Sequence, residues 1–190
     1  MKRKNFTKVC LAVTSFVWSP IAFLTSAARS VRASKGFKVD SGKDRFDKAI
    51  SPIEGDTFFT KISTKDTDGD MYVFESTRLK EGGPAHHIHF DQDEWWYVLQ
   101  GQFLIKIGDT TYEAKAGDSI FGPRMIPHSF SKVGEGVAKL LIIFQPAGKM
   151  EELFKKLSEG VDKNMSEEEQ NKFREQHGVK IVGPRIRPLK

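Results

Sequence analysis

A group of histidines with a nearby glutamate has the spacing of a metal-binding site. His86, His87 and His89 lie within four positions, and Glu94 follows five residues after the last of them. On a strand, His87 and His89 point to the same face, with Cα atoms about 6.6 Å apart. From that separation each imidazole can place a nitrogen about 2.1 Å from one divalent ion. His86 has the opposite parity, so we expect it to face away from that point.

Glu94 can join the two histidines only if a turn separates it from them. Its odd offset from His89 would place it on the wrong face of one continuous strand. The intervening residues 90–93, FDQD, are polar and typical of a turn. We therefore expect Glu94 to open the next strand and to share a face with Trp96 and Val98.

His128 is the fourth candidate ligand, and it comes from a separate segment, AGDSIFGPRMIPHSF. Pro123 and Pro127 argue against a fully paired central strand around it, so we expect His128 on a loop or a strand edge. Three neutral imidazoles and one carboxylate suit Fe(II), Mn(II), Ni(II), Co(II) or Zn(II) and disfavour Cu(I), calcium and magnesium. On an octahedral ion, such a set leaves two positions for water, substrate or dioxygen.

Short strands separated by turns must position these residues. From Phe58 onward, runs such as FFTKIS, MYVFESTRL, EWWYVLQ, FLIKI and KLLIIF alternate with the breaks DTDGD, EGGP and GDTT. Breaks at roughly 8–12 residue spacing indicate an all-β sandwich or barrel. Residues 140–144 are apolar throughout, which predicts a strand buried on both faces.

The pattern changes to a helical period after residue 148. Met150, Phe154 and Leu157 form one stripe of a first helix. Ser166 and Glu169 form a capping box, which predicts a second helix that ends near Gly178. We expect the two helices to pack on the outside of the β domain or to close one end of it.

The two histidine-bearing segments resemble the two sequence motifs of the cupin family. The residues at motif positions are Gly82, His87, His89, Glu94 and Gly101 in the first motif, and Gly117, Pro123 and His128 in the second. Three positions depart from the family pattern. Gly82 lies one residue nearer His87 than the commonest spacing, Met125 replaces the usual second glycine, and Lys132 stands where asparagine is frequent.

The resemblance implies a single-domain, quercetinase-like cupin of the all-β class. Its fold would be a jelly-roll (double-stranded β-helix) barrel with a short C-terminal α-helical extension. One divalent transition-metal ion would lie inside the barrel, bound by His87, His89, Glu94 and His128. The expected boundaries are an N-terminal arm over residues 29–50, the cupin domain over 51–148 and the helical extension over 149–190.

The expected open metal positions favour a metal-dependent oxygenase of the dioxygenase type. Its substrate would be a small aromatic or enolisable compound, because the residues expected to share the lumen are Phe74, Trp96, Phe121 and Phe130. Glu94 would be a catalytic residue as well as a ligand, accepting a proton from a substrate hydroxyl as general base. Two alternatives stay open. One is a non-catalytic cupin that binds a small molecule or sugar through the metal, and the other is a metal-dependent isomerase or epimerase.

The first 28 residues have the organisation of a secretory signal peptide. A basic stretch over residues 2–8 precedes twenty uncharged residues, with Ser26 and Ala28 before a plausible cleavage point. This predicts a secreted or periplasmic protein without a stable membrane span after cleavage. The alternative is a membrane anchor formed by the uncleaved leader. The one cysteine, Cys10, lies in this segment, which excludes a disulfide framework and a cysteine-rich zinc site.

The charge distribution argues against a nucleic-acid partner. Of the 30 Lys and Arg residues, four lie in the first 28 residues, which hold no acid, so 26 basic and 25 acidic residues remain. A nearly neutral domain lacks the electrostatic attraction to phosphate that such binding needs. The expected partner is a small-molecule substrate or ligand. Trp95 or Tyr97, on the outer face, could also contribute to a contact with a second copy of the chain.

Overall fold

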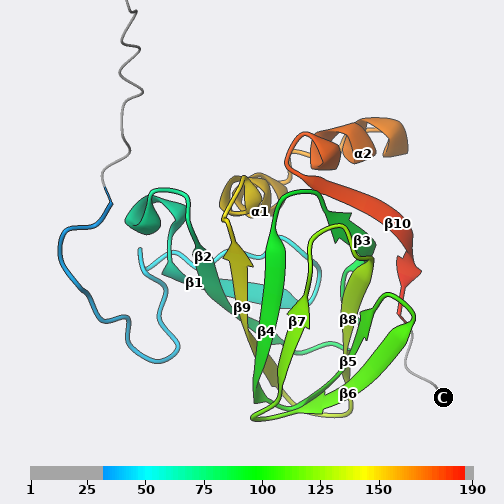
Figure 1. The fold of residues 1–190 in the computed structure, drawn as a ribbon, viewed down its shortest axis with the longest axis horizontal. Helices are drawn as coiled ribbons and strands as arrows, with labels where there is room; N and C mark the ends of the chain where they lie inside the picture. The colour runs from blue at the N-terminus through cyan, green and yellow to red at the C-terminus, as the bar shows by residue number, and fades with distance from the viewer. Residues whose placement is uncertain (1–31, 187–190) are drawn as a thin grey trace, which may run out of the picture.

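The computed structural model describes residues 32–186, which form two five-stranded antiparallel sheets that face each other (Figure 1). In spatial order, the first sheet consists of β1 (Asp56–Ile62), β2 (Tyr72–Arg78), β9 (Ala138–Gln145), β4 (Asp93–Gln100) and β7 (Ser119–Gly122). The second consists of β10 (Val179–Arg185), β3 (Ala85–His89), β8 (His128–Val133), β5 (Gln102–Ile107) and β6 (Thr110–Lys115). This jelly-roll arrangement confirms the predicted fold class.

The hydrophobic core lies between the two sheets because side chains alternate along each strand. Trp96 and Val98 of β4 have no exposed surface, and Phe103 and Ile105 of β5 in the other sheet are 1% and 0% exposed. The predicted sharing of one face by Glu94, Trp96 and Val98 is thereby confirmed. Burying these large side chains provides the main favourable free energy for bringing the sheets together.

The prediction that residues 140–144 are buried on both faces of the strand is wrong for one of the two faces. Leu140, Ile142 and Phe144 of β9 are buried in the core, whereas Leu141 and Ile143 are only partly buried. β9 pairs with β2 on one edge and with β4 on the other. The continuous apolar run therefore marks a strand in the middle of a sheet, not a strand covered on both faces.

The segment before β1 is attached along that strand. Ile50 exchanges two backbone hydrogen bonds with Phe58, at 2.8 and 3.1 Å, and the Arg45 amide donates to the Thr60 carbonyl at 2.8 Å. The carboxylate of Asp44, which is 7% exposed, accepts a hydrogen bond from the Thr60 amide at 2.6 Å. Residues 44–50 of the predicted N-terminal arm are therefore attached to β1, whereas residues 32–43 are mostly exposed. The 3-10 turn η1 (Thr64–Thr67) then connects β1 to β2.

The C-terminal segment contains the two predicted helices, α1 (Met150–Ser158) and α2 (Glu167–Glu175), at the top of Figure 1. The Ser166–Glu169 capping box is present, with the Ser166 hydroxyl accepting from the Glu169 amide. The segment is not wholly helical, however. After Gly178 the chain forms β10, which pairs with β3 along the edge of the second sheet. The alternation of apolar and polar residues in VKIV was the one sequence signal for this strand, but it is too short to distinguish a strand from an irregular C-terminal segment.

Candidate metal centre

The strand β3 presents His87 and His89 to the inside of the barrel, as their spacing predicts. His87 is 9% exposed and His89 is 1% exposed. His86 lies on the other face and is only partly buried. β3 is held between β10 and β8, and His87 faces His128 across the pairing with β8. The parity argument from sequence is therefore confirmed for all three histidines of this segment.

Glu94 comes from β4 in the opposite sheet, and it is 4% exposed. The turn over residues 90–92 resets the strand parity, as expected. His128 differs from its expected position, because it is the first residue of β8, a strand in the middle of the second sheet. Pro123 and Pro127 lie in the turn that precedes β8, so they end before the pairing begins. The proline argument placed the break correctly, but His128 is paired with a strand on each side and does not lie on a loop or a strand edge.

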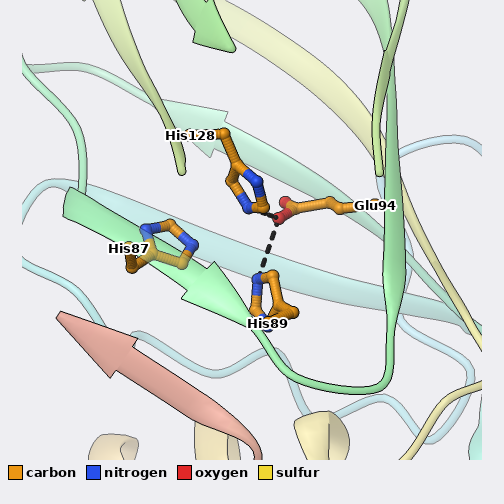
Figure 2. Close-up of side chains that lie close together, drawn as sticks. All are labelled: His87, His89, Glu94 and His128. Atoms are coloured by element: carbon orange, nitrogen blue, oxygen red, sulfur yellow. Dashed lines mark hydrogen bonds and ion pairs between the residues drawn. The ribbon is translucent and has the colours of Figure 1, made fainter. Parts of the chain in front are cut away.

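The four side chains converge on one point from two sheets (Figure 2). Their nearest donor atoms all lie within 4.8 Å of one another. Glu94 Oε2 is 3.1 Å from His89 Nε2 and 3.1 Å from His128 Nε2. An octahedral ion with ligand bonds of about 2.1 Å would hold opposite donors about 4.2 Å apart, so small side-chain adjustments would suffice to enclose one.

Backbone contacts fix which nitrogens face the centre. His87 Nδ1 lies 2.7 Å from the Ala85 carbonyl oxygen, and His128 Nδ1 lies 2.9 Å from the Ile126 carbonyl oxygen. A carbonyl only accepts, so each Nδ1 carries a hydrogen and donates it. In the neutral ring, Nε2 then carries a lone pair that is directed inward. The hydrogen bond from Nδ1 to the carbonyl orients the ring, as is usual for metal-binding histidines.

The inward lone pairs make the cluster complementary to a cation. With neutral His128, Nε2 and Glu94 Oε2 are two acceptors that face each other at 3.1 Å. Two buried acceptors at this distance repel unless a proton or a cation lies between them. The residues present therefore fit a divalent metal ion, on the chemistry of the donor set and its burial.

The protonation states also favour a ligating form at neutral pH. Burial, together with the neighbouring His89 and His128, lowers the pKa of His87 to about 3. Burial raises the pKa of Glu94, but its contacts with His128 and His89 outweigh burial and lower the pKa to about 2. An unprotonated imidazole and an ionised carboxylate are the forms that bind metal.

Three of the four side chains, His87, His89 and Glu94, line a cavity of about 440 Å³. Phe74 and Phe130 line this cavity, as expected from the sequence. Phe121 does not, and the prediction that it shares the lumen is wrong. It lies opposite Trp95 in the pairing of β7 with β4, which turns it outward, and it is 57% exposed. Because Ile120 and Phe121 are both apolar, the sequence SIF allows either of them to face the interior. Only the register of β7 against β4 determines that Phe121 faces outward.

Trp96 is fully buried against His128, with ring centroids 5.3 Å apart. Trp95 and Tyr97 are partly exposed on the outer face of the first sheet. A homodimer contact through them stays a prediction. Sequence reasoning missed the cavity wall that the C-terminal segment provides, because nothing in the local pattern of residues 149–185 shows where that segment folds back.

Two of the three departures from the cupin pattern, Met125 and Lys132, have local consequences. Met125 has a φ of 63°, the left-handed conformation that glycine adopts without strain. Its amide donates to the His89 carbonyl at 2.8 Å, so this turn is joined to the strand that carries two of the candidate ligands. Lys132 is 1% exposed, and its ammonium group donates to the Gly134 carbonyl. Neither substitution displaces the four converging side chains.

The fold and the site define an all-β barrel protein with a candidate metal centre inside a jelly roll. Residues 77–144 match the family model of the cupin domain. The matched segment contains the strands that carry the four side chains, and it is a cupin domain.

Similarity to individual proteins is limited. An uncharacterized protein of Methanocaldococcus jannaschii is 32% identical over 60 residues, which are 32% of this chain and 48% of that protein, so the chain spans about half the length of this curated relative. An RmlC-like cupin from Shewanella frigidimarina is 17% identical, over 62% of this chain and 96% of that one, with a TM-score of 0.47. A predicted oxalate decarboxylase from Thermotoga maritima is 18% identical, over 52% and 90% of the two chains, with the same TM-score of 0.47. The nucleoside dehydratase Pac13 from Streptomyces is 13% identical, over 59% and 83%, also with a TM-score of 0.47.

Proposed function

We propose that this protein is a metal-dependent enzyme, an oxygenase of the dioxygenase type that acts on a small aromatic or enolisable compound. One observation carries the proposal. Three imidazole nitrogens and a carboxylate oxygen converge, buried, and three of these four side chains line a cavity together with Phe58, Phe74 and Phe154. Buried lone pairs of this kind need a cation, and a cavity beside them leaves room for a small molecule.

His87, His89, Glu94 and His128 would hold one divalent transition-metal ion, with Fe, Mn, Ni, Co and Zn all compatible with the donor set. Once bound, such an ion supplies Lewis acidity and, if it is redox-active, electrons for reaction with dioxygen. The chain contributes the fixed donor geometry. The Ala85 and Ile126 carbonyls hold the rings of His87 and His128 in the orientation that binding requires.

The aromatic wall supports an aromatic substrate. Phe58 and Phe74 stack with ring centroids 4.3 Å apart, and Phe154 meets Phe58 edge-on at 5.1 Å. All three line the cavity. An aromatic ring that enters would replace water against these faces, and offset or edge-on contacts of this kind add about 0.5–1.5 kcal/mol beyond burial.

Glu94 is the group that would accept a substrate proton. Its carboxylate is ionised at neutral pH and lies at the cavity lining, where the hydroxyl of a bound phenol or enol could reach it. Removing that proton gives an electron-rich anion that reacts more readily with an oxidant. The proton stays on the carboxylate until it is returned to the product or to water.

Oxygen uptake by the reconstituted protein tests this function. The full chain, loaded in turn with Fe(II), Mn(II) and Ni(II), would be followed with an oxygen electrode against a panel of flavonols and other aromatic enols. We expect uptake with at least one metal, abolished in His128→Ala and retained in the matched variant His86→Ala, whose side chain faces away from the centre. The absence of uptake under every loading would contradict the oxygenase proposal.

The same samples distinguish the alternative functions. Metal-dependent conversion of a sugar or keto acid without oxygen would indicate an isomerase or epimerase. Tight ligand binding without any conversion would indicate a binding protein. Glu94→Asp should retain part of the activity with a shifted pH profile, whereas Glu94→Gln should lose it, if the carboxylate accepts a proton.

We further propose that the chain is exported, with residues 1–28 as its signal. These residues lie outside the described part of the structure. Between residues 32 and 186, no helix has both the length and the apolar character to cross a membrane. N-terminal sequencing of protein recovered from the culture medium or periplasm, starting near residue 29, would support export with cleavage; a start at Met1 in a membrane fraction would support the anchor instead.

A further inference from the structure

The C-terminal segment forms a large part of the cavity that holds the four candidate ligands. From α1 it contributes Met150, Leu153, Phe154 and Leu157; from α2 and the loop before it Asp162, Glu167, Gln170, Asn171 and Arg174; and from β10 Val179, Ile181 and Arg185. All of these lie beyond residue 144, where the cupin-domain match ends. This wall is therefore an addition to the common domain, and it is the part of the cavity that can give this chain its own specificity.

α2 turns a polar face to the cavity. Glu167, Gln170, Asn171 and Arg174 follow one another at i, i+3, i+4 and i+7, which places them on one side of the helix, and all four line the cavity. No residue of α2 is fully buried, and its one apolar side chain, Phe173, packs against the core. A helix on a protein surface usually turns its apolar stripe inward and its polar stripe to solvent. Here a polar stripe borders the cavity, so it is placed to contact a polar part of a ligand.

Arg174 is the partly buried cation of this face. Its side chain is 22% exposed, and its Nη2 donates to Gln170 Oε1 at 3.2 Å. The same nitrogen is 3.5 Å from Asp162 Oδ2, longer than the roughly 2.7–2.9 Å of a strong charge-assisted hydrogen bond. A guanidinium has five N–H donors, and these two contacts share one nitrogen. Arg174 is thus held in place by weak contacts and keeps capacity for another anion.

The other charges at the cavity are less suited to bind a ligand. Glu54 is already paired with Lys80, whose Nζ lies 2.8 Å from its carboxylate. Glu167 lies in the first turn of α2, where the helix dipole favours a carboxylate. Arg185 also lines the cavity, but it is exposed on the last residue of β10. A more exposed cation gains less from an ion pair because water competes for it.

We propose that α2 is the wall that selects the substrate and that Arg174 binds its carboxylate group. The inference deepens the proposed function and rests on it for the aromatic part of the ligand. The substrate class is then an aromatic acid, with its ring against the phenylalanine wall and its hydroxyl groups at the candidate metal centre. A guanidinium matches a carboxylate in a two-bond geometry that a lysine could not provide.

Binding of matched acids and amides tests the role of Arg174. Isothermal titration calorimetry would use the full chain loaded with Zn(II), which does not turn over oxygen, and the probes caffeate and caffeic acid amide. We expect the wild type to bind the acid about tenfold more tightly than the amide, as a charge-assisted pair implies. Arg174→Gln should remove that preference and leave amide binding unchanged. Asp162→Asn should enlarge the preference, because it removes the competing carboxylate.

Lys172→Gln is the matched control, because Lys172 is an exposed cation on the same helix and lies outside the cavity lining. It should leave the preference intact. An equal affinity of the wild type for acid and amide, or a preference that survives in Arg174→Gln, would overturn the inference. If Arg174→Gln destabilises α2, the variant Asp162→Asn provides the test. The absence of a gain in acid preference in that variant would contradict the proposal that Arg174 binds the carboxylate. The inference about Arg174 and the proposed metal-dependent function can fail separately. If the acid preference persists after metal removal, and the ring hydroxyls have no effect on affinity when metal is present, the role of Arg174 is supported and the metal-dependent function is contradicted.

Discussion

The two ends of the barrel interior both bury charged groups, and they do so in opposite ways. At one end, Glu94 and three imidazoles direct acceptors at one another beside a cavity. At the other end, Arg78 donates to Asp56, and Ser76 Oγ donates to the same carboxylate at 2.9 Å. The strand pairing separates the two ends. Tyr72, at the start of β2, pairs with Phe144 of β9, which also pairs with Glu94, whereas Arg78, at the end of β2, pairs with Ala138 at the opposite end of β9.

The difference shows how a buried charge reveals its role. The carboxylate of Asp56 faces donors from the chain itself, Arg78 and Ser76, although burial still raises its pKa. The carboxylate of Glu94 faces His128 Nε2, which is also an acceptor when that ring is neutral, so this pair lacks a compensating group unless a proton or a cation lies between the two atoms. Satisfied groups of the first kind are structural, and convergent acceptors of the second kind indicate a ligand site.

Breaking the compensated end should have the largest effect on stability. Arg78→Met leaves the Asp56 carboxylate buried without its cation and should lower the free energy of unfolding by about 3–5 kcal/mol. Urea denaturation followed by tryptophan fluorescence measures this. The double variant Asp56→Asn with Arg78→Met should recover part of the loss, because no uncompensated charge remains. Equal stability of the single and double variants would contradict a charge-based account.

At the other end, removing the carboxylate charge should affect metal binding more than folding. Glu94→Gln should weaken binding of Mn(II) or Zn(II) by at least about 100-fold, since even residues that only support ligands are worth 10–100-fold. In metal-free protein the same change should not lower the melting temperature, because the new amide N–H₂ can donate to an imidazole nitrogen. Glu113→Gln, an exposed carboxylate on β6, is the control for charge alone. A lower metal-free stability of Glu94→Gln would mean that the cluster is structural.

A third buried carboxylate sharpens the comparison through its pH dependence. Glu151 accepts from Ser63 Oγ and the Thr64 amide, each at 2.8 Å, and from Lys155 Nζ at 2.6 Å. Burial raises the pKa of Glu151, but hydrogen bonds from Lys155, Ser63 and Thr64 outweigh it and lower the pKa below the usual 4.5. Because donors from the chain itself surround it, the carboxylate of Glu151 is structural, like that of Asp56.

Because the folded-state pKa of Glu151 is lowered, its contribution to stability is present above the unfolded-state pKa and is lost as the pH falls through the folded-state pKa. Glu151→Gln should therefore cost about 1–3 kcal/mol at pH 7 and progressively less below pH about 4.5. Denaturation midpoints across that pH range measure the difference. Glu152→Gln, at a neighbouring and half-exposed position of α1, should change the midpoint little at any pH.

The smallest expected effect concerns Met125, in the turn beside the candidate centre. A side chain at a φ of 63° costs roughly 1–2 kcal/mol, part of which glycine offsets by its greater freedom when unfolded. Met125→Gly should therefore raise the free energy of unfolding by up to about 1 kcal/mol and leave metal affinity unchanged. Met125→Ala keeps the strained φ and should show no such gain; equal gains in both variants would exclude the backbone explanation.

The candidate site was more predictable from sequence than the cavity around it. The period of two along a strand orients His87 and His89, and the polar turn before Glu94 resets the parity, so local rules were sufficient for those three. The position of His128 was predicted in part, because the prolines mark the break but not the residue at which pairing resumes. Phe121 was assigned to the wrong face, because a short apolar strand fits either register until its partner strand is known.

What the sequence alone determined is the local periodicity: which stretches are strands, which side chains share a face, where the capped helix begins and which four residues could ligate a metal. Only the tertiary structure decided that β4 brings Glu94 from the opposite sheet, that β10 returns to pair with β3, and that α2 carries Arg174 to the cavity. The physical reason is that dihedral preferences and side-chain alternation act between near neighbours in the chain. The meeting of residues far apart in the chain, such as Glu94 with His128 or His89 with Val179, depends on how whole sheets bury their apolar faces against one another.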